Sequence, residues 1–114
     1  MSKQKIFVTA RCPIRTTIEL IGGKWKLIIL QQLITNDELR LSELKKLIPD
    51  ISEKMLIQEL KTLVQSDLAA RKNYGEVPPR VGYSISEKGI NVKPLIEEMA
   101  NFGKKYDNRQ AAAN

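Results

Sequence analysis

The chain has 114 residues, 42% of them hydrophobic, and a formal net charge of +6. This length predicts one domain, residues 1–114, built around a single hydrophobic core. One cysteine and no histidine exclude an internal disulfide, a histidine-containing zinc site and a Cys–His or Ser–His nucleophile, so we expect no enzyme, no metal and no cofactor.

Two helices are predicted in the N-terminal third. Pro13 favours a helix start, because the first turn does not use the N–H that proline lacks. Three isoleucines then repeat at i, i+4 and i+7, which predicts one buried stripe: Ile14, Ile18 and Ile21. Gly22-Gly23 ends this helix. The next helix, residues 24–35, is apolar around most of its circumference and is expected to be the central core helix.

Two short helices with a proline turn between them come next. The first is predicted over residues 42–48, and the second runs from residue 52 to about residue 65, with Pro49-Asp50-Ile51 as the turn. Ser42 and Ser52 are placed as N-caps, whose hydroxyl oxygens accept hydrogen bonds from amides of the first turn. This order is typical of a helix-turn-helix, in which the second helix enters the major groove of DNA.

A basic hairpin follows directly. Alternating side chains predict strands over residues 68–74 and 80–85, with residues 75–79 as the tip. Val81, Tyr83 and Ile85 are expected to point to the same face. The predicted fold class is therefore mostly α with a small β-hairpin wing (α+β). It is a winged helix-turn-helix whose DNA-reading part spans about residues 39–85.

Ser86 is expected to cap a last helical region that reaches about Asn108 and breaks near Pro94. The apolar stripe of this region is wider than packing on so small a core requires. We therefore predict that residues 86–108 and the first helix, about residues 12–22, form a homodimer. The predicted interface residues are Leu95, Met99, Phe102 and Tyr106. The alternative is that the first three of them close the core of a single chain.

The two ends of the chain carry little pattern. The first five residues and the tail, residues 110–114, are expected to be frayed.

Charge is distributed unevenly along the chain. Residues 1–50 contain nine Lys or Arg and five Asp or Glu, whereas residues 51–70 contain two and three. The predicted recognition helix is thus not basic, and attraction to phosphate must come mainly from its flanks.

Four side chains of the recognition helix are predicted to contact DNA. Ser52 is placed to bind a phosphate, and Lys54 and Lys61 to reach phosphate or guanine. Gln58 carries the amide that pairs with adenine. The alternative is that this polar stripe is only the solvated face of an amphipathic helix.

Three cations of the hairpin are predicted to contact the DNA backbone or the minor groove: Arg71, Lys72 and Arg80. The alternative is an ordinary charged hairpin, whose Lys, Arg and Pro residues discourage pairing with another sheet. Lys24 and Lys45 are further predicted phosphate contacts.

Cys12 lies directly before Pro13 at a predicted helix start, beside Arg11 and three residues before Arg15. Helix N-terminal amides and nearby cations favour the thiolate, so one interpretation is that Cys12 senses an oxidant or an electrophile. The other is that it is a small buried hydrophobe, as most lone cysteines are.

Several short motifs occur together in one order. They are Cys12-Pro13, Gly23-Lys24-Trp25, Ser42-Glu43-Leu44, Ile51-Ser52-Glu53-Lys54-Met55-Leu56, Pro78-Pro79-Arg80-Val81, Tyr83-Ser84 and Ser86-Glu87-Lys88-Gly89. In this combination the chain resembles the HxlR-type winged-helix transcriptional regulators, relatives of the MarR group, from about Cys12 to Tyr106. The resemblance implies a DNA-binding regulator. It also implies a sensing role for Cys12, because several members of the family sense oxidative or electrophilic stress at the matching Cys-Pro position.

The chain departs from the family pattern at four places. Gly82 stands where the family usually has an acidic residue, and Leu41 stands where it favours Phe. Asp67-Leu68 replaces the customary Gly-Leu, and Phe102-Gly103 replaces Trp-Gly. The Asp67 change leaves the shape of the turn between the recognition helix and the hairpin open.

These features predict a bacterial-type transcriptional regulator of the cytoplasm, which binds a near-palindromic site in double-stranded DNA as a homodimer. The family resemblance implies a repressor rather than an activator. An oxidant or small-molecule effector is expected, and no motif in the sequence identifies it. No apolar run approaches the roughly 20 residues of a membrane span, so no membrane partner is expected. The alternative function is a winged helix used for protein–protein contact without sequence-specific DNA binding.

Overall fold

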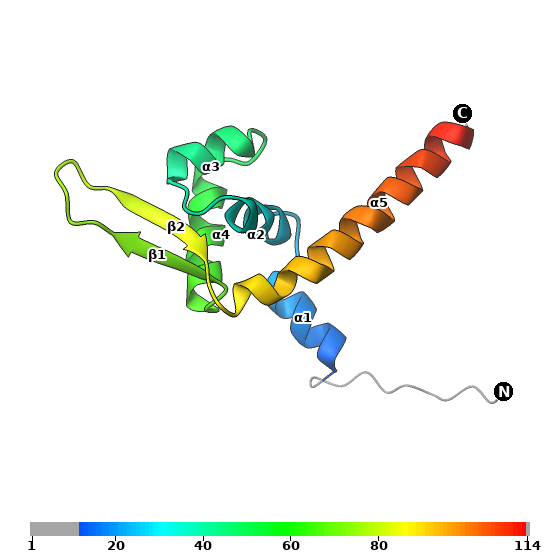
Figure 1. The fold of residues 1–114 in the computed structure, drawn as a ribbon, viewed down its shortest axis with the longest axis horizontal. Helices are drawn as coiled ribbons and strands as arrows, with labels where there is room; N and C mark the ends of the chain where they lie inside the picture. The colour runs from blue at the N-terminus through cyan, green and yellow to red at the C-terminus, as the bar shows by residue number, and fades with distance from the viewer. Residues whose placement is uncertain (1–11, 114) are drawn as a thin grey trace.

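The computed structural model of the protein describes residues 12–113 (Figure 1). The elements of these residues are α1 (Pro13–Ile21), α2 (Lys26–Thr35), α3 (Leu41–Leu47), α4 (Glu53–Gln65), β1 (Ala69–Asn73), β2 (Val81–Ile85), the short 3-10 helix η1 (Gly89–Val92) and α5 (Lys93–Ala113). In Figure 1, α2, α3 and α4 gather at the base of the hairpin, and α5 extends away from them on the opposite side. The predicted fold class, mostly α with a β-hairpin wing, is confirmed.

The hydrophobic core lies between α2, α3, α4 and the base of the hairpin. Helix α2 contacts α3, α4, α5 and β2, so it is the central helix that its apolar sequence predicts, although it begins at Lys26. The buried core residues are Ile21, Ile29, Leu30, Leu33, Leu39, Leu44, Ile48, Ile51, Leu56, Leu60, Leu63, Leu68 and Ala69. The helix-turn-helix is therefore held in place by side chains from almost every element of the described chain.

The helix-turn-helix is formed by α3 and α4. Ser52 caps α4 as predicted, because its Oγ accepts the Met55 N–H at 3.1 Å. The prediction for Ser42 is wrong, since α3 begins at Leu41 and its N-cap is Arg40. The Arg40 N–H donates to Glu43 Oε1 at 2.8 Å. A carboxylate three residues into the helix thus supplies the acceptor, and the helix starts two residues earlier than a cap at Ser42 requires.

The turn from α4 to β1 keeps its shape without glycine. Asp67 adopts a positive φ of 62°. The Leu68 N–H donates to the Leu63 carbonyl at 2.9 Å and the Asp67 N–H to the Val64 carbonyl at 3.0 Å. These two bonds define a Schellman motif, whose left-handed position favours glycine. Asp67 therefore occupies a conformation that an L-residue adopts at a cost.

Replacing Asp67 with glycine is expected to raise the free energy of unfolding by roughly 0.5–1 kcal/mol, because glycine relieves the positive φ. The lost ion pair, in which Lys88 Nζ lies 3.5 Å from Asp67 Oδ2, is exposed and contributes little. Thermal unfolding measures the gain, expected as a rise of a few degrees in Tm. Asp67→Ala keeps the Cβ and is the matched control. A Tm for Asp67→Gly at or below that of Asp67→Ala would contradict the account.

The wing, β1 and β2 with the intervening residues 74–80, is an antiparallel hairpin whose register pairs Ala69 with Ile85 and Asn73 with Val81. Residue 39 extends it, since Leu39 and Tyr83 exchange backbone hydrogen bonds of 2.9 and 2.8 Å. The loop between α2 and α3 thus runs beside β2 like a short third strand. Both strands are slightly shorter than predicted.

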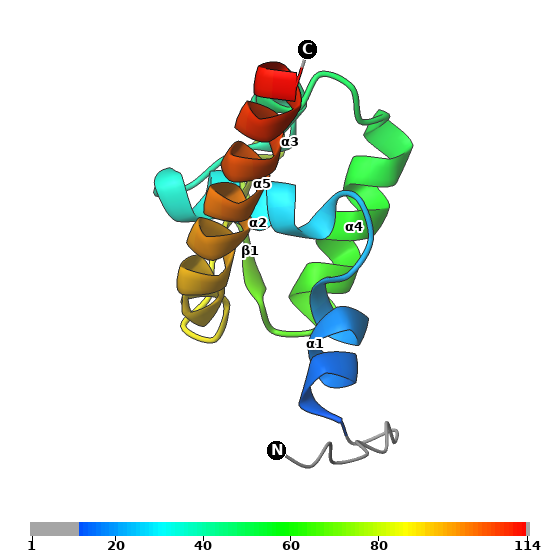
Figure 2. The same cartoon turned by 90° about the vertical axis from the view of Figure 1, so that its right-hand side faces the viewer.

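The prediction of a buried stripe on α1 is wrong for the single chain. Ile21 is buried, but Ile14 is 71% exposed and Ile18 is 61% exposed. Helix α1 leaves the body at an angle, so that only its C-terminal end reaches the core (Figure 2). The spacing therefore predicts the apolar side of α1 correctly, but the described part of the chain does not cover Ile14 and Ile18.

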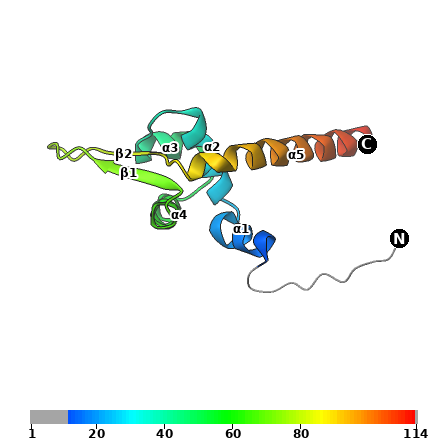
Figure 3. The ribbon, with the colours of Figure 1, turned by 60° about the horizontal axis from the view of Figure 1, so that its bottom comes forward.

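The last helical region is divided near Pro94 as predicted, because the 3-10 helix η1 ends at Val92 and α5 begins at Lys93. Pro94 is the second residue of α5, where its missing N–H is not needed. The helix also continues to Ala113, past Asn108 and through most of the predicted frayed tail. The predicted frayed start, residues 1–5, lies outside the described residues. Helix α5 projects beyond the body on the same side as α1 (Figure 3). Within residues 12–113 no helix combines the length and apolar character that crossing a bilayer needs.

Candidate nucleic-acid interface

Helix α4 presents one apolar and one polar face. Leu56, Leu60 and Leu63 are fully buried. The predicted DNA-contacting side chains of the helix, Lys54, Gln58 and Lys61, are all exposed. This separation follows from the rotation of about 100° per residue in an α-helix. The polar face is therefore available to a partner along its whole length.

The orientation of α4 is fixed by a half-buried ion pair as well as by leucines. Lys26 Nζ on α2 lies 2.9 Å from Glu59 Oε2 on α4, and the two side chains are only 16% and 17% exposed. The ion pair neutralises the charge of Glu59, one of the two acidic residues of α4. Ser52 is exposed, but its Oγ already accepts the Met55 N–H, so its remaining capacity toward a phosphate is to donate its hydroxyl hydrogen.

The recognition helix and the wing share a cleft. This space of about 460 Å³ is lined by Ile57, Lys61, Val64, Gln65, Arg71 and Tyr83. Lys61 comes from α4 and Arg71 from β1, and both are exposed. The structure thus brings one predicted cation of the helix and one of the wing to the same space, as a phosphate-binding surface requires.

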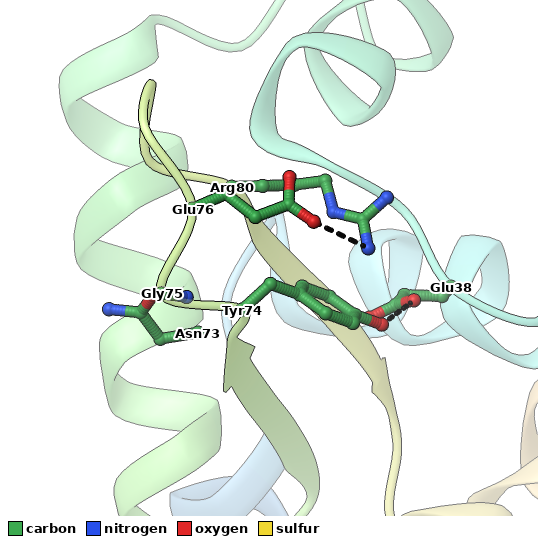
Figure 4. A network of polar contacts seen from close by, with 6 residues as sticks. All are labelled: Glu38, Asn73, Tyr74, Gly75, Glu76 and Arg80. Carbon is green, nitrogen blue, oxygen red and sulfur yellow. Dashed lines mark hydrogen bonds and ion pairs between the residues drawn. The ribbon is translucent and has the colours of Figure 1, made fainter.

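The other two predicted wing cations lie on the opposite face of the hairpin, against one aromatic ring. The Arg80 guanidinium lies 3.9 Å from the centroid of the Tyr74 ring, and Lys72 Nζ lies 4.7 Å from it. Arg80 also approaches Glu76, with 3.5 Å between Nη2 and Oε1 (Figure 4). Its Nε is buried and has no hydrogen-bond partner among the described residues. Arg80 is therefore held in a defined orientation and is not a free surface cation.

The two remaining predicted phosphate contacts are less well placed. Lys45 Nζ donates to the Pro49 carbonyl at 2.9 Å, so this lysine stabilises the turn between α3 and α4. Lys24 lies in the loop between α1 and α2, outside the helix-turn-helix, with its Nζ 4.6 Å from the centroid of the Trp25 ring. Neither joins the cleft between α4 and the wing.

The sequence reasoning missed Glu38 and Tyr74, which meet where β1 passes into the tip of the wing. The Tyr74 hydroxyl donates to the Glu38 carboxylate, with oxygen–oxygen distances of 2.7 and 2.6 Å (Figure 4). This hydrogen bond, together with desolvation, raises the pKa of Tyr74 above its ordinary value of 10.0. One signal was present in the sequence: glycine at position 82, where the family resemblance predicts an acid. Glu38 now places its carboxylate over that glycine.

The predicted dimer residues are not covered by the described part of the chain. Leu95, Met99, Phe102 and Tyr106 are all exposed, Phe102 to 72%. Val92 and Ile96, on another side of the same segment, pack against the core. The alternative, that Leu95, Met99 and Phe102 close the core of a single chain, does not describe this structure.

Cys12 is the N-cap residue of α1 and is half-buried. Its carbonyl accepts the Thr16 N–H at 3.0 Å, the first hydrogen bond of the helix. Cys12 lines a shallow space of about 340 Å³ together with Ile14, Arg15, Ile18 and Glu19. It is not among the buried core residues of the described chain, and it lies beside the exposed isoleucines of α1.

A helix-turn-helix followed by a hairpin, with cations of both around one cleft, defines the winged helix-turn-helix class of DNA-binding proteins. The family model described as HxlR-like helix-turn-helix matches residues 20–111. The chain belongs to the HxlR-like helix-turn-helix family, and it is a DNA-binding transcriptional regulator.

Individual relatives agree with this assignment. The uncharacterized HTH-type transcriptional regulator YkvN of Bacillus subtilis (strain 168) is 46% identical over 101 residues, which cover 89% of this chain and 85% of the relative. A crystal structure described as a MarR-family transcriptional regulator from Porphyromonas gingivalis W83 is 46% identical, with a TM-score of 0.82, and the match covers 88% of this chain and 97% of that one. The redox regulator HypR in its oxidized form is 34% identical, with a TM-score of 0.77, over 82% of this chain and 96% of that one. These names support DNA binding over the alternative of a protein–protein module.

Proposed function

We propose that the protein is a cytoplasmic homodimeric repressor, which binds a near-palindromic operator and is controlled by a thiol-reactive signal at Cys12. The observation that carries the DNA-binding part is the cleft in which Lys61 of α4 and Arg71 of β1 meet beside the exposed polar face of α4. In this arrangement α4 enters the major groove and the wing contacts the flanking backbone. The assignment as a repressor rests on the family resemblance.

The dimer is supported by apolar side chains at the end of the molecule opposite the wing. Ile14 and Ile18 on α1 and Met99 and Phe102 on α5 are exposed. Large apolar patches of this kind mark interaction surfaces. The proposed domain organisation therefore assigns residues 39–85 to reading DNA and residues 12–22 and 86–108 to pairing with a second copy, which brings two recognition helices to two half-sites.

Control by thiol chemistry is supported by the position of Cys12 at the start of α1, within the proposed dimer surface. HypR, a relative of the same fold, is described as a redox regulator. Because the chain has one cysteine, a disulfide at Cys12 must join it to a second thiol, either a small-molecule thiol or Cys12 of another copy. Either product places new bulk or a covalent link where α1 is expected to meet its partner.

The proposal is tested by recovering genomic fragments of the source organism with the purified protein, before and after diamide treatment. We expect the recovered fragments to share a site with two-fold symmetry. Diamide is expected to lower the affinity for them about 5- to 150-fold, the usual range of coupling between sites.

Cys12→Ser is the matched control, and it should bind the same fragments with and without diamide. Recovery of no enriched fragment would overturn the DNA-binding part of the proposal. Equal binding by the wild-type protein with and without diamide would overturn the thiol part alone.

A further inference from the structure

We propose that Glu38 is a positioning residue for the wing: its carboxylate holds Tyr74, and through Tyr74 it sets where Arg80 and Lys72 meet the DNA backbone. The proposal rests on the DNA contact of the wing given above, and it adds a residue that lies outside both the recognition helix and the hairpin. Figure 4 shows the arrangement, with the Tyr74 hydroxyl pointing to Glu38 and the Arg80 side chain above the ring.

The contact joins three separate segments. Glu38 lies in the loop between α2 and α3, Tyr74 follows the last residue of β1, and Arg80 precedes β2. The Tyr74 hydroxyl donates to both carboxylate oxygens of Glu38 at 2.7 and 2.6 Å. Hydrogen bonds to a charged acceptor are short and stronger than those between neutral groups. The helical body is thus tied to the hairpin at the point where the exposed tip begins.

The backbone around Glu38 is arranged to place this carboxylate. Leu39 forms an antiparallel bridge with Tyr83, which holds residue 38 beside β2, and from there the Glu38 side chain reaches across to Gly82. Position 82 is glycine, and a Cβ there would overlap the Glu38 carboxylate and its Cγ. The space above Gly82 is therefore taken by a side chain from a distant loop. A larger residue at position 82 would displace Glu38 from Tyr74.

The aromatic ring of Tyr74, which Glu38 holds in place, contacts both Arg80 and Lys72. The Arg80 guanidinium lies 3.9 Å from the ring centroid and Lys72 Nζ lies 4.7 Å from it. If the ring moves, both cations move with it. Fixing the wing before it meets DNA also removes part of the ordering cost that a mobile hairpin would add to binding.

The contact is stable across the ordinary pH range. The Glu38 carboxylate raises the pKa of Tyr74 above 10.0, so the phenol keeps its proton and remains a donor at neutral pH. The stabilisation that the protonated Tyr74 gains from this bond is fully present below pH 10, and it is lost as the pH rises through the raised pKa.

The first test compares the DNA affinity of two variants that each lose one carboxylate. Removing an acidic side chain near DNA should strengthen binding when the acid only repels phosphate. We expect Asp37→Ala, which removes the neighbouring exposed carboxylate, to bind a recovered operator fragment as well as the wild type or slightly better. Glu38→Ala is expected to bind it about 5- to 20-fold more weakly, in proportion to one lost hydrogen bond to a charged group. Stronger binding by Glu38→Ala would overturn the proposal.

The second test keeps the carboxylate and removes the hydroxyl. Tyr74→Phe retains the ring under Arg80 and should weaken binding by a similar factor with an unchanged salt slope, since no cation is lost. Gly82→Ala should do the same by displacing Glu38. The double variant Tyr74→Phe/Gly82→Ala should bind DNA only slightly more weakly than either single variant, because both substitutions break the same contact. Full additivity, or wild-type affinity of Tyr74→Phe, would overturn the positioning role.

Arg80→Gln separates this role from the DNA contact of the wing itself. We expect it to weaken binding to all sequences and to flatten the salt dependence by about one unit of slope for each half-site. An unchanged slope together with unchanged affinity would show that the wing does not contact DNA through Arg80, which contradicts the proposed interface. A flattened slope beside wild-type affinity of Tyr74→Phe would overturn only the role of Glu38.

Discussion

Replacing Met99 with glutamate is expected to convert the protein from a dimer into a monomer and to lower operator affinity by about 100-fold or more. Met99 is 49% exposed on α5 and lines an apolar space together with Leu27 and Ile28 of α2. In the proposed dimer this space is covered by the second copy, so a carboxylate there would be buried without a partner. Leaving such a charge unpaired costs several kcal/mol, and about 2.8 kcal/mol corresponds to 100-fold.

Sedimentation at micromolar concentration measures this change, from twice the chain mass to the 13.0 kDa of one chain. Leu47→Glu is the matched control, because Leu47 is 48% exposed but lies on α3, far in sequence from the proposed interface. It should remain dimeric. A wild-type protein that sediments as a monomer would remove the dimer from the proposal, and a dimeric Met99→Glu would place the interface elsewhere.

Replacing both Lys61 and Arg71 with glutamine is expected to weaken binding to every DNA sequence, by roughly tenfold for each cation. The two side chains line one cleft from α4 and β1, and each neutralises a phosphate in the proposed complex. Each lost phosphate contact lowers the slope of the logarithm of the binding constant against the logarithm of salt concentration by about 0.9. The double variant should therefore lose about 1.8 units of slope for each half-site.

Fluorescence anisotropy of a labelled duplex at several salt concentrations gives this slope. Lys104→Gln provides the control, because it removes one exposed cation from α5 on the side away from the wing and should leave the slope unchanged. A double variant with the wild-type slope would show that the cleft between α4 and the wing does not hold DNA phosphates.

Local sequence patterns predicted the reading elements well. The cap at Ser52, the leucines of α4 and the alternation of the hairpin are set by neighbours within a few residues, so their signals are readable in the sequence. The start of α3 was predicted one residue late, since the acceptor of its cap is a carboxylate inside the helix. The break predicted near Pro94 corresponds to the junction of η1 and α5, because proline is acceptable in the first turn of a helix and disruptive in its interior.

Contacts between residues that are far apart in the sequence could not be predicted from such local patterns. The spacing of Ile14, Ile18 and Ile21 showed that one side of α1 is apolar, but it does not reveal whether that side packs on its own chain or on another. The contact between Glu38 and Tyr74 joins residues 36 positions apart. No period or motif connects two such residues, and only the glycine at position 82 indicated that something occupies the space above it.

The ion pair between Lys26 and Glu59 has a consequence for how the protein finds its operator in a genome. Within α4 the two lysines are balanced by two acids, one of them held by Lys26, so the helix contributes almost no net pull toward a random phosphate backbone. The weak binding that lets a regulator slide along DNA then falls to the cations of the wing and its surroundings. Search is thus carried mainly by the wing and its surroundings, with Lys61 as the phosphate contact of α4, and the other polar side chains of the helix gain affinity only where they match the bases.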